Sequence, residues 1–333
     1  MKYSVAIVGA TGLVGQVLLS LLEKKKFPVS ELIPVASSKS VGKSVTFQRR
    51  EWQVVSVEDA LKKKPQLAIF SAGGEMSKAY APKFAEAGTT VIDNSSAWRM
   101  DENVPLVVPE INADIIRLSD KIIANPNCST IQLVVALAPL HRSLHLKRIT
   151  VATYQSVTGS GEKAVRQLEN ERRGDYSYLH YPYHIDLNVL PHGGDFLNNG
   201  YTQEEMKLVN ESQKILKHPD LEVNATVVRV PVKGGHSEAV TAEFRKKFNI
   251  RDVRDILAIS SGITLQDDPS QHVYPMPRYA EGQDEVFVGR LRQDLFRKNI
   301  LSMWVVSDNL RKGAATNAIQ IAQHLISNKM VRH

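Results

Sequence analysis

Residues 3–15 read YSVAIVGATGLVG, an apolar strand that leads through a glycine turn into an amphipathic helix expected to run to about Lys26. Gly9, Gly12 and Gly15 stand three residues apart in this stretch. Glycines at such positions allow a tight turn, a close approach of the backbone to a pyrophosphate, and close packing of helix on strand. The position between strand and helix favours a dinucleotide-binding turn over a plain strand–helix connection.

The loop after the next predicted strand indicates which dinucleotide would bind. The strand covers residues 32–36, and residues 37–40 (SSKS) follow it. NAD-binding folds usually place an Asp or Glu near this point, where it binds the ribose hydroxyls. This loop has neither and offers hydroxyls, Lys39 and, further on, Lys43, which suit a 2′-phosphate. The loop therefore indicates NADP rather than NAD, with a solvated surface loop as the alternative.

Strands and helices continue to alternate through the first third of the chain. Apolar runs at residues 67–70 and 90–93 read as strands, and a helix is expected between them at residues 78–87. Such alternation predicts a parallel, doubly wound sheet. Ser71 directly follows the first of these strands, and Arg99 lies in the loop after the second. Both are therefore expected at the edge of the sheet where ligands bind, with a solvated surface arginine as the alternative for Arg99.

Residues 125–130 read NPNCST and contain Cys128, the only cysteine of the chain. A buried strand is expected at residues 121–124, and an apolar, helix-like run begins at Ile131. Cys128 is thus predicted near a helix N-terminus, where free backbone N–H groups and the helix dipole favour a thiolate. The same N–H groups could hold a developing oxyanion. A small, inert core cysteine is the alternative interpretation.

The second half of the chain carries longer strands. Strands are expected at residues 149–157, 223–232, 238–245, 285–292 and 300–306. Helices are expected at residues 162–173, 204–216, 253–259 and 310–327. This pattern predicts a larger mixed or antiparallel sheet with helices on one face. Residues 174–202 form a long irregular connection rich in Gly, Pro, Asn, His and Tyr, and such a length is either functional or disordered.

Four charged or titratable side chains of this half stand at informative positions. Glu211 and Lys214 are three residues apart and share one face of a predicted helix. Arg229 lies seven residues before His236, which follows a double-glycine turn. An ordinary helix ion pair is the alternative interpretation of the first two residues.

Length and composition bound the class of protein. The chain has 333 residues, 43% of them hydrophobic and 23% charged, as in a soluble protein with two domains. We expect an NADP-binding domain at residues 1–127, completed by a C-terminal helix at 310–333, and a second domain at 128–309. No apolar run approaches the roughly 18 residues that a membrane span needs, and the N-terminus does not resemble a signal peptide. A lone cysteine excludes an internal disulfide and a cysteine-based metal site, and we expect a reducing cytoplasm.

The net charge of +7 suggests anionic partners. The basic residues are scattered, and aromatic residues do not interleave with them as they would on a stacking surface for nucleic acid. Phosphorylated small molecules are therefore the better match.

The assembled motifs closely resemble those of the bacterial aspartate-β-semialdehyde dehydrogenase family over essentially the whole chain. The resemblance rests on VAIVGATGLVG, ASSKS, DNSSAWRM, VPEIN, NPNCST, YQSVTGSG, RVPVKGGHS and GAATNAIQIA. It implies a Rossmann-type NADP-binding domain and an α+β domain, as in glyceraldehyde-phosphate dehydrogenase, usually in a homodimer built through the second domain. It also implies reversible, NADP-dependent conversion of 4-aspartyl phosphate to aspartate semialdehyde and phosphate. That step leads to diaminopimelate, lysine, methionine and threonine.

The resemblance also implies roles for individual residues. Cys128 would be the nucleophile, His236 the acid/base, and Gln155 the residue that orients the acyl group. Arg229 and Glu211 would hold the substrate carboxylate and amino groups. The phosphate would be held by Arg99, Lys214 and Asn127. The cofactor would contact Gly9, Thr11, Gly12, Leu13, Val14, Lys39, Ser40, Ser71, Gly159 and Asn317.

One position departs from the family pattern. Lys39 stands where many members have arginine at the 2′-phosphate. Lysine binds a phosphate as a point charge, without the two-pronged geometry of arginine. The preference for NADP over NAD is therefore expected to be weaker than usual.

Two rival functions are compatible with parts of this pattern. An N-acetylglutamyl-phosphate reductase would use the same fold and the same cysteine chemistry. Glu211 discriminates against it, because a free substrate amine needs a nearby anion and an acetylated one does not. A non-catalytic NADP-binding regulator would keep the glycine turn but would not need Cys128, Gln155 and His236.

Overall fold

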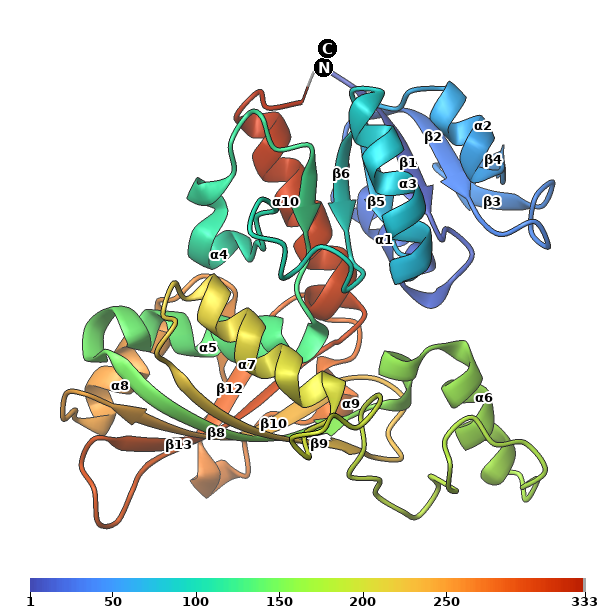
Figure 1. Ribbon diagram of the computed structural model, residues 1–333. Helices are drawn as coiled ribbons and strands as arrows, with labels where there is room; N and C mark the ends of the chain where they lie inside the picture. The colour runs from blue at the N-terminus through green and yellow to red at the C-terminus, as the bar shows by residue number, and fades with distance from the viewer. Residues whose placement is uncertain (332–333) are drawn as a thin grey trace. The chain divides into compact units, whose positions relative to one another are not determined.

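The computed structural model describes residues 1–331, and the chain divides into two compact units (Figure 1). The first comprises Met1–Asn127 and the segment that starts at Ala314, whereas the second comprises Cys128–Gly313. Residues 332 and 333, the end of the predicted first domain, lie outside the described part of the chain. Each unit has its own main sheet, as the length of the chain allows.

The first unit is built on a five-stranded sheet in the order β2-β1-β5-β6-β7, and all neighbouring strands in it are parallel. The strands are β1 (Tyr3–Val8), β2 (Val29–Val35), β5 (Leu67–Phe70), β6 (Thr90–Asp93) and β7 (Ile122–Ala124). The helices are α1 (Leu13–Lys24), α2 (Val57–Lys62), α3 (Gly74–Glu86), α4 (Pro109–Asn112) and α10 (Thr316–Ser327). The predicted doubly wound fold is therefore confirmed.

Side chains of β1 alternate between two cores, one on each face of this sheet. Val5 and Ile7 pack in the cluster that contains α1 and α10, including Leu18, Leu22, Ile319 and Leu325. Ala6 and Val8 pack in the other cluster, together with Ala60 of α2 and Phe84 of α3. Helices on both faces explain why the strand reads as a continuous apolar run rather than an alternating one.

A small hairpin in the first unit was not predicted. It consists of β3 (Ser44–Phe47) and β4 (Arg50–Gln53), which pair antiparallel. The connecting residues Gln48 and Arg49 both have positive φ angles, 51° and 59°. Glycine and asparagine are the usual residues in such turns, so the sequence gives no turn signal at this point.

The second unit is built on a six-stranded mixed sheet in the order β11-β12-β13-β10-β8-β9. Its strands are β8 (Leu146–Gln155), β9 (Glu222–Arg229), β10 (His236–Phe244), β11 (Ile263–Leu265), β12 (Val286–Gln293) and β13 (Ile300–Ser307). The pairs β8–β9 and β11–β12 are parallel, and the other pairs are antiparallel. The prediction of a larger mixed sheet is confirmed.

Three helices, α5 (Cys128–Leu144), α7 (Gln203–Ile215) and α8 (Ile250–Ala258), lie on one face of this sheet (Figure 1). The remaining helices of the unit are α6 (Glu162–Glu171) and α9 (Pro277–Ala280). Several predicted strand limits are wrong, and β8 covers residues 146–155 rather than 149–157. β9 ends at Arg229, shortly before Pro231, which has no N–H to donate to a ladder, and β10 begins at His236 rather than at residue 238.

The predicted start of the last helix is also wrong. A π-helical turn, Arg311–Ala315, precedes α10, so the regular helix begins at Thr316 and not at residue 310. Such turns often occur where backbone is adapted to a functional site.

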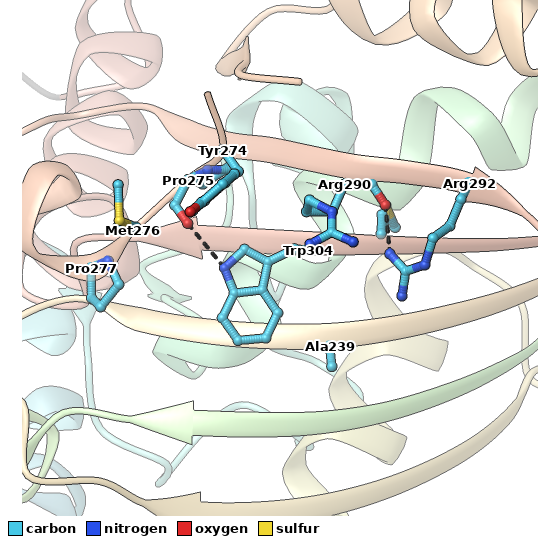
Figure 2. A pocket seen from close by; sticks show the side chains of 9 residues that line it. Ala239, Tyr274, Pro275, Met276, Pro277, Arg290, Arg292 and Trp304 are labelled. Atoms are coloured by element: carbon cyan, nitrogen blue, oxygen red, sulfur yellow. Dashed lines mark hydrogen bonds between the residues drawn. The ribbon is translucent and has the colours of Figure 1, made fainter. Parts of the chain in front are cut away.

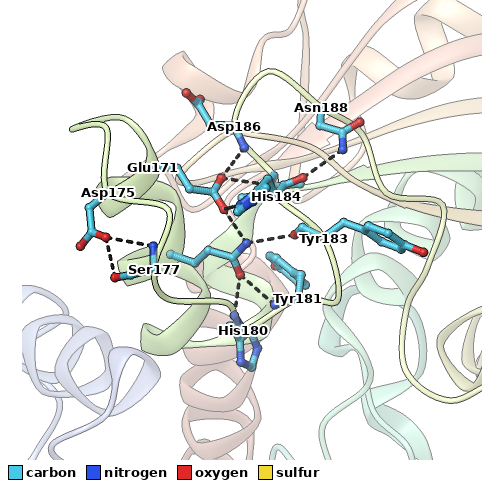
Figure 3. Close-up of polar contacts among 11 residues, drawn as sticks. Glu171, Asp175, Ser177, His180, Tyr181, Tyr183, His184, Asp186 and Asn188 are labelled. Carbon is cyan, nitrogen blue, oxygen red and sulfur yellow. Dashed lines mark hydrogen bonds and ion pairs between the residues drawn. The ribbon is translucent and has the colours of Figure 1, made fainter.

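The long connection of residues 174–202 has no helix or strand of its own but is fixed by buried side chains of α6 (Figure 3). Gln167 Oε1 accepts hydrogen bonds from the backbone N–H groups of residues 180 and 181, at 2.7 and 2.8 Å. Glu171 Oε2 accepts from the N–H groups of Ile185 and Asp186, at 2.9 and 2.7 Å. Tyr181 and Ile185 also join a buried apolar cluster with Leu168. The segment is therefore packed rather than disordered.

Within residues 1–331, no helix combines the length and the apolar character needed to cross a bilayer. The same part of the chain brings together no group of three or more His, Cys, Asp or Glu side chains suited to a metal ion.

Candidate active site

Polar side chains of the second unit meet at one end of its sheet. Gln155 and Arg229 are the last residues of β8 and β9 and stand opposite each other in the ladder. Arg229 Nη1 donates to Gln155 Oε1. Gln155 Nε2 donates to Ser129 Oγ at 2.9 Å and to Thr153 Oγ1 at 3.3 Å. Because Ser129 follows Cys128 in the first turn of α5, these bonds tie the start of that helix to the strand ends.

His236 lies at the same end, since β10 starts there and pairs antiparallel with β8. The backbone N–H of Ser156 donates to His236 Nδ1 at 3.0 Å. Among the described residues, His236 Nε2 has no hydrogen-bond partner. A Cβ added to Gly159 would lie 2.8 Å from this Nε2 and 3.1 Å from Arg229 Nη1. Gly159 therefore lies directly against both side chains.

The surroundings of His236 hold its imidazole in the neutral form. The side chain is fully buried, and burial lowers the pKa of His236 to about 3. The positive charge of Arg229 acts in the same direction, whereas the Glu204 carboxylate and the backbone at Gly235 oppose it. In a ring that is neutral at physiological pH, one nitrogen can donate a proton and the other can accept one.

Cys128 is the first residue of α5, a helix of 17 residues, and its side chain is partly exposed. The alternative of an inert, fully buried core cysteine does not match this position. A Cβ added to Gly313 would lie 2.8 Å from the Cys128 Cβ, so only glycine leaves room beside this side chain. This role of Gly313 was not predicted, although the small residues around it are visible in the sequence. Asn127, directly before Cys128, is buried and ends the first unit.

Glu211 and Lys214 lie on α7, which packs against β9 and α5. Glu211 is buried and Lys214 is partly exposed. The helix therefore brings one negative and one positive side chain to the same part of the second unit.

The glycine turn of the first unit has the geometry that its sequence predicts. Gly9 has a φ of +96°, and a Cβ there would lie 2.3 Å from the Ser71 carbonyl oxygen. A Cβ at Gly15 would lie 2.2 Å from the Gly9 carbonyl oxygen. Gly12 stands at the N-terminus of α1, and Thr11 beside it is exposed. Positive φ and close packing require glycine here, and the exposed helix N-terminus fits a pyrophosphate.

The other predicted cofactor residues of this unit lie around the same sheet edge. Leu13 and Val14 open α1 and are partly buried, and Ser71 directly follows β5. Lys39 is exposed and Ser40 is partly buried in the turn after β2.

Arg99 and Asn317 are fixed by backbone groups of the first unit. Arg99 is buried and donates to the carbonyl oxygens of Asn125, at 3.0 Å, and Asn94, at 2.7 Å. Asn317 Nδ2 donates to the Val107 carbonyl oxygen at 2.9 Å and to Asn125 Oδ1 at 2.7 Å. Both side chains therefore stabilise the loop before Cys128, whatever else they bind.

A hollow on the second sheet belongs to a different surface (Figure 2). It is lined by Ala239, Trp304, Arg290 and residues 274–277, among others. Side chains along a strand alternate between faces, so Ala239 points away from the face of His236. The hollow is therefore not part of the candidate active site.

Comparison with known proteins shows the family to which the chain belongs. Residues 4–119 match the family described as semialdehyde dehydrogenase, NAD binding domain, and residues 137–312 match semialdehyde dehydrogenase, dimerisation domain. The fold and the cysteine-containing site thus define a semialdehyde dehydrogenase.

Individual relatives narrow the class. Aspartate-semialdehyde dehydrogenase of Aquifex aeolicus (strain VF5) is 48% identical, over 99% of this chain and 100% of that one. The crystal structure of aspartate semialdehyde dehydrogenase II from Vibrio cholerae, complexed with ASA, is 43% identical with a TM-score of 0.94, over 98% and 99% of the two chains. That of the Candida albicans enzyme with NADP is 25% identical with a TM-score of 0.78, over 99% and 100%. The chain belongs to the aspartate-semialdehyde dehydrogenase family.

Proposed function

We propose that this protein catalyses the reversible, NADP-dependent reductive dephosphorylation of 4-aspartyl phosphate to aspartate 4-semialdehyde. This step would serve the biosynthesis of lysine, methionine and threonine. The observation that carries the proposal is the gathering of Gln155, Arg229 and His236 at the strand ends beside the helix start that bears Cys128. Membership of the family supports the substrate and the reaction.

The first chemical step needs an activated sulfur. The Cys128 thiolate attacks the acyl carbon of aspartyl phosphate, the carbon–oxygen bond to phosphate breaks, and a thioester forms as phosphate leaves. The N-terminus of α5 favours the anionic sulfur and can hold the developing oxyanion. Gln155 orients the acyl group, since Ser129, Thr153 and Arg229 hold its amide in place.

Reduction then takes place at the same carbon. When bound, the nicotinamide dinucleotide supplies or accepts the hydride. His236 Nε2, which has no hydrogen-bond partner among the described residues, would handle the proton of the substrate oxygen as the carbon–sulfur bond breaks and the aldehyde leaves.

Separate groups of side chains would recognise the cofactor and the substrate. The glycine turn, with Gly9, Thr11, Gly12, Leu13 and Val14, would hold the pyrophosphate, with Ser71, Gly159 and Asn317 as further contacts. Lys39 and Ser40 would bind the 2′-phosphate. Arg229 would bind the substrate carboxylate and the buried Glu211 its ammonium group. Arg99, Lys214 and Asn127 would bind the phosphate.

The alternative substrate, N-acetylglutamyl phosphate, is not favoured, because the near full-length relatives reported above are aspartate-semialdehyde dehydrogenases. A buried carboxylate at Glu211 also agrees with a free substrate amine. A non-catalytic regulator would not need a partly exposed cysteine next to Ser129, the residue that Gln155 binds.

The oligomeric state is also part of the proposal. The second half of the chain matches a dimerisation domain, and one face of its sheet carries exposed or partly exposed side chains such as Tyr154 and Trp304. We propose a homodimer built through this face. Light scattering coupled to gel filtration distinguishes a dimer from a monomer or a tetramer. We further propose a cytoplasmic location, since a single catalytic thiolate needs a reducing compartment.

The deciding experiment measures phosphate-dependent reduction of NADP with aspartate semialdehyde, for the wild type and for Cys128→Ser. The serine variant should keep its fold by circular dichroism and lose nearly all turnover. Because Cys128 is the only cysteine, iodoacetamide should label the wild type once and inactivate it, and substrate should protect it. Substantial turnover in the variant would remove the thioester from the mechanism, and no turnover in the wild type would refute the proposed reaction.

A further inference from the structure

Asn309, shortly after β13, is a buried hub of hydrogen bonds in the second unit. Its Oδ1 accepts from Ser156 Oγ at 3.0 Å, from Thr158 Oγ1 at 3.2 Å and from the backbone N–H of Gly235 at 3.2 Å. Its Nδ2 donates to Thr158 Oγ1 at 3.1 Å. A backbone N–H can only donate, so the bond from Gly235 fixes which end of the amide is the oxygen.

Two of these partners, Ser156 and Gly235, lie directly next to His236. Ser156 donates its backbone N–H to His236 Nδ1 at 3.0 Å, and its hydroxyl oxygen lies 3.0 Å from the same nitrogen. Gly235 directly precedes His236 in the chain. One side-chain oxygen, that of Asn309, therefore fixes both the donor to the ring and the backbone from which the ring projects.

The bond from Ser156 also determines which ring nitrogen carries the proton. The backbone N–H cannot turn away or accept, so His236 Nδ1 must offer its lone pair. In the neutral imidazole the single proton then resides on Nε2. A second proton on Nδ1 would face this N–H, and the ring is fully buried next to the Arg229 guanidinium of β9. Glu204 of α7 is the negative group that acts against this tendency.

We propose that Asn309 is a positioning residue that, together with the Ser156 N–H, holds His236 in the neutral form protonated at Nε2. His236 Nε2, which lies against Gly159 and has no hydrogen-bond partner among the described residues, then meets the substrate as a hydrogen-bond donor. In this form His236 polarises the substrate carbonyl through a hydrogen bond from Nε2 and does not present an unprotonated Nε2 as a base. The inference rests on the proposed function only for the identity of that carbonyl; the state of the ring can be measured without turnover.

Nitrogen-15 NMR of protein labelled at histidine tests the state of the ring. The signal of His236 is assigned as the one lost in His236→Gln. We expect the neutral form with the proton on Nε2 at pH 7, persisting as the pH is lowered to 5. A proton on Nδ1, or a charged ring at pH 7, would overturn the proposal. A protein that shows the expected tautomer but no activity would instead argue against the proposed reaction.

Two variants test the role of Asn309. Asn309→Asp keeps an oxygen for all three donors and adds a negative charge, so the His236 signal and the acid limb of the kcat/KM profile should both move to higher pH. Asn309→Ala should lower kcat about 10- to 100-fold and broaden or mix the ring signal, because the ring loses its support. Lower thermal stability with unchanged kcat and unchanged ring signal in both variants would reduce Asn309 to a structural residue and overturn the proposal.

Asn112 provides a matched control in the first unit. It is equally buried, accepts from the Val108 N–H at 2.9 Å and donates to the Leu106 carbonyl oxygen at 2.9 Å. Asn112→Ala should lower the melting temperature and leave the His236 signal and kcat unchanged. A change in the ring signal here would show that the signal follows general loosening of the fold, which contradicts the specific role of Asn309.

Discussion

Replacing Gly159 with alanine would place a methyl group against the ring of His236. The added Cβ would lie 2.8 Å from Nε2, 2.9 Å from Cε1 and 3.1 Å from Arg229 Nη1. Carbon and nitrogen atoms in ordinary contact are separated by about 3.5 Å or more, so the ring or the glycine loop must move by about 0.7 Å. The ring is held at Nδ1 by Ser156 and is fully buried, so it cannot turn aside freely.

The displacement gives the expected size of the effect. A misplacement of about 1 Å at a reacting group can cost about 100-fold in rate. We therefore expect kcat for aspartate semialdehyde to fall about 10- to 100-fold in Gly159→Ala, which corresponds to about 1.4 to 2.7 kcal/mol of activation free energy. The backbone at Gly159 does not have a positive φ, so alanine adds no backbone strain there.

The assay is phosphate-dependent NADP reduction under saturating cofactor, with melting temperature as the measure of folding. Gly234→Ala is the control, because the three atoms nearest to its Cβ would all belong to the exposed Glu281 side chain, the first at 2.7 Å. That side chain can move aside, so the control should keep near wild-type kcat. Activity of Gly159→Ala within about twofold of wild type would refute the assignment of His236 Nε2 as the atom that meets the substrate. A raised KM for NADP with unchanged kcat would instead support the predicted cofactor contact of Gly159.

Three other predictions concern recognition and pH. Arg229→Lys should raise the KM for aspartate semialdehyde about tenfold and leave NADP binding unchanged, because lysine loses the paired donors for a carboxylate; an equal loss for both ligands in steady-state kinetics would contradict this role. Lys39→Ala should narrow the preference for NADP over NAD, and an unchanged ratio of the two kcat/KM values would mean that other groups recognise the 2′-phosphate. Because the folded protein lowers the pKa of His236, the free energy of unfolding should fall in acid. The contribution of His236 to this free energy is complete above the unfolded pKa of 6.5 and is lost as the pH falls toward the folded pKa of about 3. Denaturant titrations between pH 7 and 5 should show this loss, up to about 1.4 kcal/mol per pH unit, and His236→Gln should lack it; equal slopes in both proteins would show that His236 is not buried in its neutral form.

The first unit could be predicted in outline because its signals are local. The glycines after β1 fix a strand, a turn and a helix within a few residues, and the apolar runs of β5 and β6 identify buried parallel strands. The hairpin of β3 and β4 was missed because Gln48 and Arg49 adopt positive φ without being glycine or asparagine. Its register depends on the pairing itself, and not on a turn signal.

The candidate site divides in the same way between local and distant information. Cys128 and His236 were identified from their motifs, whereas Asn309 was not, because it acts on Ser156 from 153 residues away in the chain. Gly313 was missed for a similar reason, since its proximity to the Cys128 side chain is a product of the fold. The connection of residues 174–202 could not be called ordered from its composition, because its order depends on buried acceptors in α6, among them Glu171.

The packing of α10 has a consequence for the order in which the chain matures on the ribosome. Ile319 and Leu325 complete the same apolar cluster as Leu18 and Leu22, so the nucleotide-binding unit is complete only after the segment that starts at Ala314 has been synthesised. The sheet of the second unit has all of its strands well before that point. Chains halted at Gly313 should therefore protect the amide hydrogens of β8 and β10 from exchange while those of β1 exchange freely, the reverse of folding from the N-terminus.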